Sequence, residues 1–213
     1  MKLLEASNIS HSFDYPLFNN IHIELLQGES VAILGRSGSG KSTILHILST
    51  LLPPNEGEVF YKGKDLYKLK EDELLNIRRY EMGIIFQAHY LFKGFTGFEN
   101  IKISSLIAKK PIYKSLLKRL DIESVLKKNV GDLSGGQQQR ISIARVLAKN
   151  PRVIFADEPT GNLDRETADD VMNVLFNYIQ EVKGALLLVT HDEELASRCT
   201  KSYRLRNKVL EYA

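Results

Sequence analysis

The sequence predicts an α/β fold with a mainly parallel sheet at its core. Short apolar runs alternate along the chain with segments of helical spacing, a pattern typical of parallel sheets covered by helices. Residues 30–34 form a β-branched apolar run that ends at Gly35, which predicts a strand buried on both faces. The apolar spacing of residues 41–52 predicts the next helix, which Pro53 and Pro54 end.

The same alternation continues to the end of the chain, apart from one helical stretch. A turn at residues 55–57 precedes the second predicted strand. The predicted strands cover residues 58–61, 82–86, 152–156, 185–190 and 202–205. Helices are predicted over residues 165–182 and 192–198. Residues 70–149 are mostly helical in pattern, so the part after the strand at 82–86 is predicted to be a helical subdomain inserted into the core.

The composition describes an ordinary folded domain. Hydrophobic residues make up 43% and charged residues 26% of the 213 residues, which excludes a disordered chain. The net charge of +3 is far from the balance of a dedicated nucleic-acid binder, so no nucleic-acid partner is expected. The first residues contain no apolar run typical of a secretory leader, so none is expected, and no apolar run approaches roughly 18 residues. Cys199 is the single cysteine, which fits a reducing compartment. We therefore expect an intracellular domain with no membrane span of its own.

The strongest motif has the form GxxxxGK[ST] and lies between a predicted strand and a predicted helix, the setting that identifies a P-loop. It comprises Gly35, Arg36, Ser37, Gly38, Ser39, Gly40, Lys41 and Ser42, followed by Thr43. Glycines allow the backbone to approach phosphate oxygens, and successive N–H groups at a helix N-terminus attract anions. Lys41 adds a charge at the β- and γ-phosphates, and the Ser42 hydroxyl can bind Mg²⁺. The motif predicts a P-loop NTPase.

Two carboxylates follow the apolar strand at residues 152–156. Asp157 and Glu158 end this run, and Pro159 stops regular structure. Ligands of open α/β sheets bind at the carboxyl ends of the strands, so both acids can face the nucleotide. Asp157 is predicted to hold Mg²⁺, and Glu158 is the predicted general base for the attacking water.

A third motif, LSGGQQQR, covers residues 133–140. Ser134 can cap a helix that continues to Leu147, and two glycines leave its first-turn N–H groups open to an anion. Each glycine costs a helix roughly 1 kcal/mol relative to alanine. A second phosphate contact would account for that cost.

With these three motifs in this order and spacing, the chain resembles ABC-type ATPase subunits over essentially its whole length. The resemblance implies an ABC ATPase cassette with an N-terminal β-subdomain, one domain over residues 1–213, and a helical subdomain at about 88–149. Gln87 resembles the Q-loop glutamine, Asn162-Leu163-Asp164 the D-loop, and His191 the switch histidine of the family.

The family resemblance also implies a head-to-tail homodimer around two ATP molecules, with Mg²⁺. Each ATP would meet the P-loop of one copy and residues of the other. The residues that would act across the dimer are Ser134, Gly135, Gly136, Gln137 and Asp164. Gln87 would contact Mg²⁺ and the water and relay closure to the helical subdomain. His191 would contact the γ-phosphate and hold Glu158 or the water.

Adenine stacks on an aromatic residue near the N-terminus in this family. Phe13 and Tyr15 would share one face of an extended segment, and alignment favours Phe13, with Tyr15 as the alternative. Further along, an aromatic cluster can pack locally or form a groove for a partner's helix. This cluster consists of Tyr90, Leu91, Phe92, Phe95 and Phe98.

Within the family, residues 159–164 resemble a group that contains lipoprotein-releasing, macrolide-export and cell-division ATPases. In that group, residues 83–91, 95–100 and 190–196 are most similar to the lipoprotein-releasing type. This implies a peripheral subunit at the cytoplasmic face of the inner membrane, bound to a separate integral membrane permease. The stretch from residue 100 to 132 is shorter than expected of the lipoprotein-releasing type. The sequence therefore does not determine which membrane protein is the partner or which substrate is transported. The alternatives are a cell-division ATPase that engages a membrane partner without transport, a soluble ABC ATPase, and a P-loop kinase.

Overall fold

A six-stranded sheet forms the centre of the protein in this computed structural model, which describes residues 1–161 and 163–213. The strand order is β10-β9-β3-β8-β7-β6. The strands are β3 (Ser30–Leu34), β6 (Met82–Ile85), β7 (Val153–Asp157), β8 (Ala185–Thr190), β9 (Lys201–Arg206) and β10 (Val209–Tyr212). Neighbours from β9 to β6 pair in parallel, and β10 runs antiparallel to β9. The predicted α/β fold with a mainly parallel sheet is therefore confirmed.

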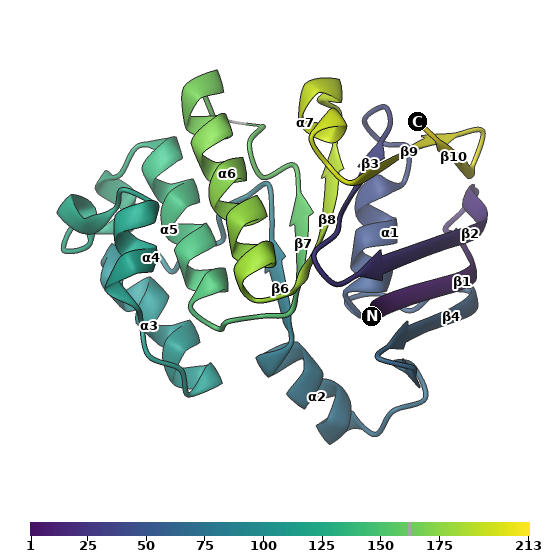
Figure 1. Cartoon of the computed structure of the whole chain (residues 1–213), viewed down its shortest axis with the longest axis horizontal. Helices are drawn as coiled ribbons and strands as arrows, with labels where there is room; N and C mark the ends of the chain where they lie inside the picture. The colour runs from purple at the N-terminus through teal and green to yellow at the C-terminus, as the bar shows by residue number, and fades with distance from the viewer. Residues whose placement is uncertain (162) are drawn as a thin grey trace.

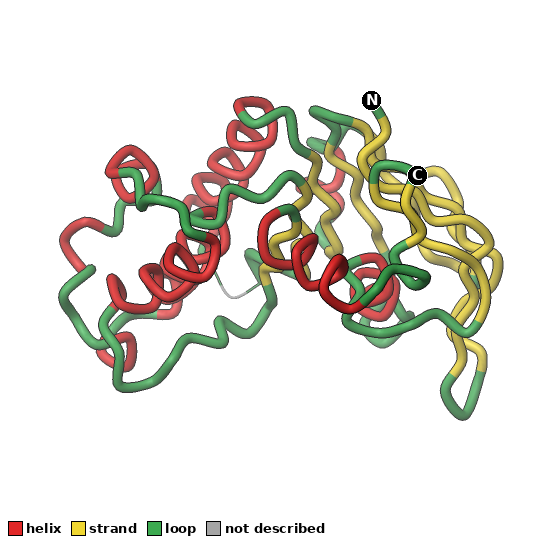
Figure 2. The backbone as a smooth tube through the Cα atoms, turned by 90° about the horizontal axis from the view of Figure 1, so that it is seen from below, coloured by secondary structure: helices red, strands yellow, loops and turns green. Residues whose placement is uncertain are grey.

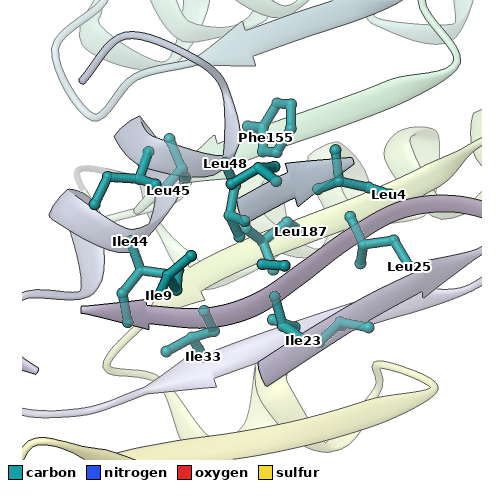
Figure 3. Packing of buried hydrophobic residues seen from close by; sticks show 14 of the residues in the cluster. Leu4, Ile9, Ile23, Leu25, Ile33, Ile44, Leu45, Leu48, Phe155 and Leu187 are labelled. Carbon is teal, nitrogen blue, oxygen red and sulfur yellow. The ribbon is translucent and has the colours of Figure 1, made fainter. Parts of the chain in front are cut away.

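Helices bury both faces of the middle of this sheet, which explains why β3, β7 and β8 are buried at every position. In β7, Val153 and Phe155 join one hydrophobic cluster, whereas Ile154 and Ala156 join another. Helix α1 (Lys41–Leu48) contributes side chains to the first cluster, and α5 (Gly135–Leu147) and α6 (Arg165–Glu181) contribute side chains to the second. Figure 3 shows the first cluster, in which side chains of α1, the sheet and the N-terminal strands meet.

A second, antiparallel sheet covers the outer side of α1, with strand order β2-β1-β4-β5 (Figure 1). Its strands are β1 (Lys2–Ser12), β2 (Pro16–Leu26), β4 (Glu56–Tyr61) and β5 (Lys64–Asp65). This is the N-terminal β-subdomain. The hydrophobic pattern alone predicts neither β1 nor β2, because Asn8 has a positive φ of 56° and the pairing register shifts beside it. The alternation that identifies a strand is broken there.

The turn predicted at residues 55–57 is wrong, because β4 already begins at Glu56. Gly57 has a φ of 91°, and a Cβ at this position would lie 2.5 Å from the backbone of Asn8. This glycine is therefore required for the close approach of β4 to β1 and does not mark a turn.

Four helical segments and α5 follow β6 and lie at one end of the molecule, with the antiparallel strands at the other (Figures 1 and 2). They are α3 (Gly97–Ala108), α4 (Lys114–Arg119), η1 (Glu123–Val125), η2 (Val130–Asp132) and α5. Helix α2 (Glu71–Tyr80) precedes β6, and α7 (Glu193–Ser197) follows β8. Helix α1 ends four residues earlier than predicted, in a turn where Thr50 has a φ of 66°. None of the helices in the described part of the chain is long and apolar enough to cross a membrane.

Candidate active site

The predicted P-loop connects β3 to α1 at the carboxyl end of the central sheet. Gly38 and Gly40 have φ values of 75° and 103°, which side chains with a Cβ rarely adopt. Lys41 folds back over the loop, and its Nζ donates hydrogen bonds to the carbonyl oxygens of Gly35 and Arg36 at 2.9 and 3.0 Å. Burial lowers the pKa of Lys41, and the charges of Glu158 and Asp157 act in the opposite direction. The loop thus holds a cation close to two carboxylates.

The remaining P-loop residues surround this lysine. Arg36, Ser37 and Gly38 are exposed, whereas Gly35, Ser39, Gly40, Ser42 and Thr43 are half-buried. The Ser39 hydroxyl oxygen is covered, and no hydrogen-bond partner is found for it among the described residues. The loop therefore presents its middle to solvent, where an anion can reach its N–H groups.

Ser42 and Asp157 are brought together from segments far apart in the sequence. The Ser42 hydroxyl donates to Asp157 Oδ1 at 3.0 Å, and Asp157 is only 9% exposed at the end of β7. Both are hard oxygen donors, and Mg²⁺ bound with phosphates needs only one or two protein ligands. The pair therefore fits a Mg²⁺ site.

Glu158 and His191 face each other at the ends of neighbouring strands. Glu158 Oε2 lies 2.8 Å from His191 Nδ1, and the Glu158 side chain is 14% exposed against 68% for His191. The ring donates to the carboxylate in the tautomer that carries the proton on Nδ1. Glu158 has a φ of 45°, which is rare for a residue with a side chain. A pocket of about 350 Å³ opens beside these two residues.

Gln87 lies just after β6, in an exposed bend. A Cβ placed on Gly161 would be 3.6 Å from Gln87 Nε2 and 3.8 Å from the Glu158 Cβ. The structure therefore brings Gln87 next to the loop that carries Glu158, as the sequence prediction requires.

The LSGGQ segment forms the exposed start of α5. Ser134 caps the helix as predicted: its Oγ accepts from the Gln137 N–H at 3.3 Å, and its own N–H donates to Gln137 Oε1 at 3.1 Å. A Cβ on Gly135 would meet no atom of the described residues within 4 Å. On Gly136 it would touch Leu163 and Thr167. No hydrogen bond between described residues joins Ser134 to the P-loop.

The predicted D-loop leads into α6. Asp164 caps that helix, because its carboxylate accepts from the Thr167 N–H at 2.9 Å and from the Thr167 hydroxyl at 2.8 Å. These hydrogen bonds lower the pKa of Asp164. Asn162, grouped with Leu163 and Asp164 by the sequence, lies outside the described residues.

The two candidate adenine-stacking residues lie in the turn between β1 and β2, so the expected extended segment is wrong. The Phe13 N–H donates to the Tyr15 carbonyl at 3.2 Å, which closes the turn. Both rings are about three-fifths exposed. Phe13 packs edge-on against buried His11 with ring centres 4.8 Å apart, and His11 stacks on Phe18.

Two groups of polar residues in the structure were not predicted from the sequence. Gln139 in α5 is 2% exposed and reaches the loop after Glu158. Arg78, Arg145 and Lys149 line a cleft between α2, α3, α5 and β6. The sequence does contain a signal for Gln139, because a polar side chain here interrupts the apolar face of α5. The three cations come from two separate elements, so no local motif marks them.

A glycine-rich loop that presents N–H groups and a lysine, next to a Ser–Asp pair and a Glu–His pair at strand ends, defines a P-loop NTPase. The sequence pattern described as "ABC transporter" matches residues 18–161, about two-thirds of the chain. The chain belongs to the ABC transporter family, and it is an ATP-hydrolysing cassette of that family.

Its relatives agree with this assignment. The chain is 39% identical to the lipoprotein-releasing system ATP-binding protein LolD of Bdellovibrio bacteriovorus, with 90% of each chain covered. It is 41% identical to LolD of Treponema denticola, with 92% of this chain and 89% of that protein covered. The fold matches the dimeric ATP-binding cassette MJ0796 bound to ADP and Pi, with a TM-score of 0.89 and 32% identity over 98% of this chain and 97% of that one.

Proposed function

We propose that this chain is the ATP-hydrolysing subunit of a membrane complex that releases lipoproteins from the inner membrane. The observation that carries the proposal is the similarity, over about nine-tenths of its length, to proteins named as ATP-binding subunits of lipoprotein-releasing systems. Residues 1–213 act as one nucleotide-binding domain, and α3 to α5, within residues 88–149, act as its helical subdomain. The subunit lies at the cytoplasmic face of the membrane as a peripheral protein.

Two copies of the chain bind two ATP molecules between them. The support is the distribution of the site: the P-loop and the start of α5 are separate phosphate-binding elements with no hydrogen bond between them in the described structure. A second copy places Ser134, Gly135, Gly136 and Gln137 of α5 against the γ-phosphate held by the P-loop of the first. Asp164 fixes the start of α6 beside this contact. The MJ0796 cassette, similar in fold, is dimeric.

The P-loop residues 35–43 bind the triphosphate through their N–H groups, and Lys41 turns from its carbonyl partners to the phosphates. Mg²⁺ neutralises charge on the β- and γ-phosphates when it is bound. Ser42 and Asp157 would hold it, because their oxygens already meet at 3.0 Å, and Gln87 would add an amide oxygen from the loop after β6.

Glu158 is the general base that accepts a proton from the attacking water. Its carboxylate is mostly buried, and among the described residues it contacts the His191 ring at 2.8 Å. His191 holds that carboxylate in place and also reaches the γ-phosphate, since the ring is exposed. Gln87 orients the water from the other side. These roles divide proton transfer and positioning between three residues.

The membrane partner docks in the cleft between α2, α3, α5 and β6. This cleft has a volume of about 290 Å³ and carries three cations, Arg78, Arg145 and Lys149. Their hydrogen bonds go to hydroxyl and carbonyl oxygens, and no carboxylate is among the described residues that line the cleft. Burial lowers the pKa of Lys149 to about 8. A cytoplasmic helix that carries a carboxylate fits this surface, because it would neutralise buried positive charge.

The aromatic cluster adjoins this cleft at Tyr90, whose carbonyl oxygen accepts a hydrogen bond from Arg145 at 2.6 Å. Tyr90, Phe92, Phe95 and Phe98 are between 39% and 66% exposed, which disfavours local core packing as their role. Exposed apolar groups at this density mark interaction sites.

The function is tested by purifying the tagged chain from detergent-solubilised native membranes. We expect an integral membrane protein to copurify in fixed ratio, with lipoproteins bound, and ATP to release them. A membrane partner that carries no lipoprotein and moves nothing in reconstituted vesicles would instead indicate the cell-division type of ATPase.

Leu51→Asp is expected to abolish capture of the membrane partner while ATP hydrolysis by the isolated subunit persists. Leu51 lines the cleft and is 51% exposed, so the substitution places a charge on the docking surface without opening the core. Val209→Asp is the matched control, since Val209 is 40% exposed on β10 at the other end of the molecule. Equal capture by both variants would place the docking surface elsewhere.

Phe13→Ala is expected to raise the KM for ATP about tenfold, because stacking of a base on an aromatic ring contributes about 1–3 kcal/mol. Phe13 is favoured over Tyr15 because its ring rests on His11 and, through Phe18, on the P-loop: a Cβ on Gly40 would lie 3.3 Å from Phe18. The KM for ATP of Phe13→Ala and of Tyr15→Ala, measured by steady-state kinetics, shows which ring stacks on adenine. A larger effect of Tyr15→Ala would assign the stacking role to Tyr15.

A further inference from the structure

Gln139 connects α5 to the loop that carries Glu158. It lies in the second turn of α5, after the LSGGQ segment, and only 2% of its surface is exposed. Its Nε2 donates a hydrogen bond of 2.7 Å to the carbonyl oxygen of Pro159, the residue directly after Glu158. The contact spans 20 positions in the sequence and joins the helical elements to the edge of the central sheet.

The Pro159 carbonyl depends on this side chain. Proline has no N–H, so the carbonyl oxygen is the one backbone hydrogen-bonding group that Pro159 possesses. The residue is buried, and a buried carbonyl oxygen needs a partner. Gln139 supplies that partner from a different structural element.

The Gln139 side chain is suited to this one hydrogen bond. Its Oε1 is also buried, and it has no hydrogen-bond partner among the residues that the structure describes. A leucine or methionine would fill the same space without burying an unpaired acceptor. The donated hydrogen bond is therefore what the amide contributes at this position.

The loop held in this way has an unusual backbone. Glu158 has a φ of 45°, its N–H donates to the Val189 carbonyl at 2.9 Å, and its own carbonyl accepts from the Gly161 N–H at 3.2 Å. Those two hydrogen bonds come from the sheet and from the loop itself. The hydrogen bond from Gln139 comes from α5, whose first turn carries Ser134.

We propose that Gln139 is a positioning residue for ATP hydrolysis, which aligns Glu158 with the start of α5 through the Pro159 carbonyl. The inference rests on the proposed role of Glu158 as the general base. When the partner copy's ATP engages Ser134, a movement of α5 is transmitted by Gln139 to the backbone next to the base. The proton acceptor is thereby in place only when both phosphate-binding elements are engaged.

Gln139→Leu tests this role, since it removes the donor and keeps the volume. We expect kcat to fall at least about tenfold, because small displacements of a reacting group cost up to about a hundredfold in rate. The KM for ATP should stay within about twofold of the wild-type value, because the P-loop is untouched. In a Glu158→Gln background, Gln139→Leu should leave the fraction of ATP-bound dimer unchanged.

Gln180→Leu is the matched control. Gln180 Nε2 also donates a 2.7 Å hydrogen bond to a backbone carbonyl, that of Gly28, but from α6 at the opposite end of the sheet strands. Its kcat should equal the wild-type value. The melting temperature of each variant is measured, and Gln139→Met replaces Gln139→Leu if the latter does not fold.

Two results would overturn the proposal. One is a kcat of the Gln139 variant within twofold of wild type. The other is a fall in kcat of the single Gln139 variant together with a loss of ATP-bound dimer when the same substitution is made in the Glu158→Gln background, which would mean that Gln139 only maintains the shape of α5. The role of Glu158 itself is decided separately by Glu158→Gln alone, because that variant leaves Gln139 intact.

Discussion

Glu158→Gln is expected to lower ATP turnover by about 10²–10⁴-fold, the usual contribution of a general base, while ATP still binds. The amide has nearly the same shape as the carboxylate, so the contact with His191 at 2.8 Å can persist. It cannot accept a proton from water, however. Since hydrolysis no longer separates the two copies, the ATP-bound dimer should accumulate.

Phosphate release and size-exclusion chromatography with ATP measure these two effects. Glu211→Gln is the control, because it removes an exposed carboxylate from β10 that is outside the residues proposed to bind ATP or Mg²⁺. Turnover of Glu158→Gln near the wild-type rate would show that another group accepts the proton.

Ser134→Arg is expected to reduce turnover at least about a hundredfold, the effect of removing a group that stabilises transition-state charge. Nucleotide affinity of the monomer should hardly change. The reason is that Ser134 and Gly135 lie at the exposed start of α5, with no hydrogen bond to the P-loop among the described residues. The bulky side chain blocks the surface on which the partner's ATP would rest.

The substitution also removes the cap of α5, which costs about 1 kcal/mol. Thr96→Arg is the matched control, because Thr96 caps α3 through the same reciprocal pair of hydrogen bonds, here with Glu99. It should lose similar thermal stability and keep its turnover. A large loss of nucleotide affinity in the Ser134→Arg monomer would mean that this segment serves the ATP of its own chain.

The strands that the sequence predicts well are those that consist of one short, continuous run of apolar residues. The strands β3, β7 and β8 are apolar at every core position because helices cover both faces, so each one is visible without knowledge of its neighbours. The N-terminal strands are half-exposed, and a bulge at Asn8 interrupts them. The register of β1 with β2 is irregular, and β1 also pairs with the distant β4, so the resemblance to a family, and not the pattern, implied these strands.

The turn that contains Phe13 and Tyr15 illustrates the same limit. An alternating pair such as Phe13 and Tyr15 predicts a shared strand face, but the chain reverses there and a hydrogen bond between the two residues closes the turn. Asn55 stabilises this arrangement, because its side chain accepts from the Ser12 N–H at 2.7 Å. That contact joins residues 43 positions apart and has no local signature.

By itself the sequence determined the chemistry of this protein. A P-loop, a strand-end pair of acids and the LSGGQ segment are contiguous motifs, because phosphate groups are bound by consecutive backbone N–H groups and by helix ends. Tertiary structure alone decided which of these elements meet: Ser42 with Asp157, Glu158 with His191, and Gln139 with Pro159. Such contacts depend on packing between segments that are distant in the sequence, so no local sequence pattern predicts them.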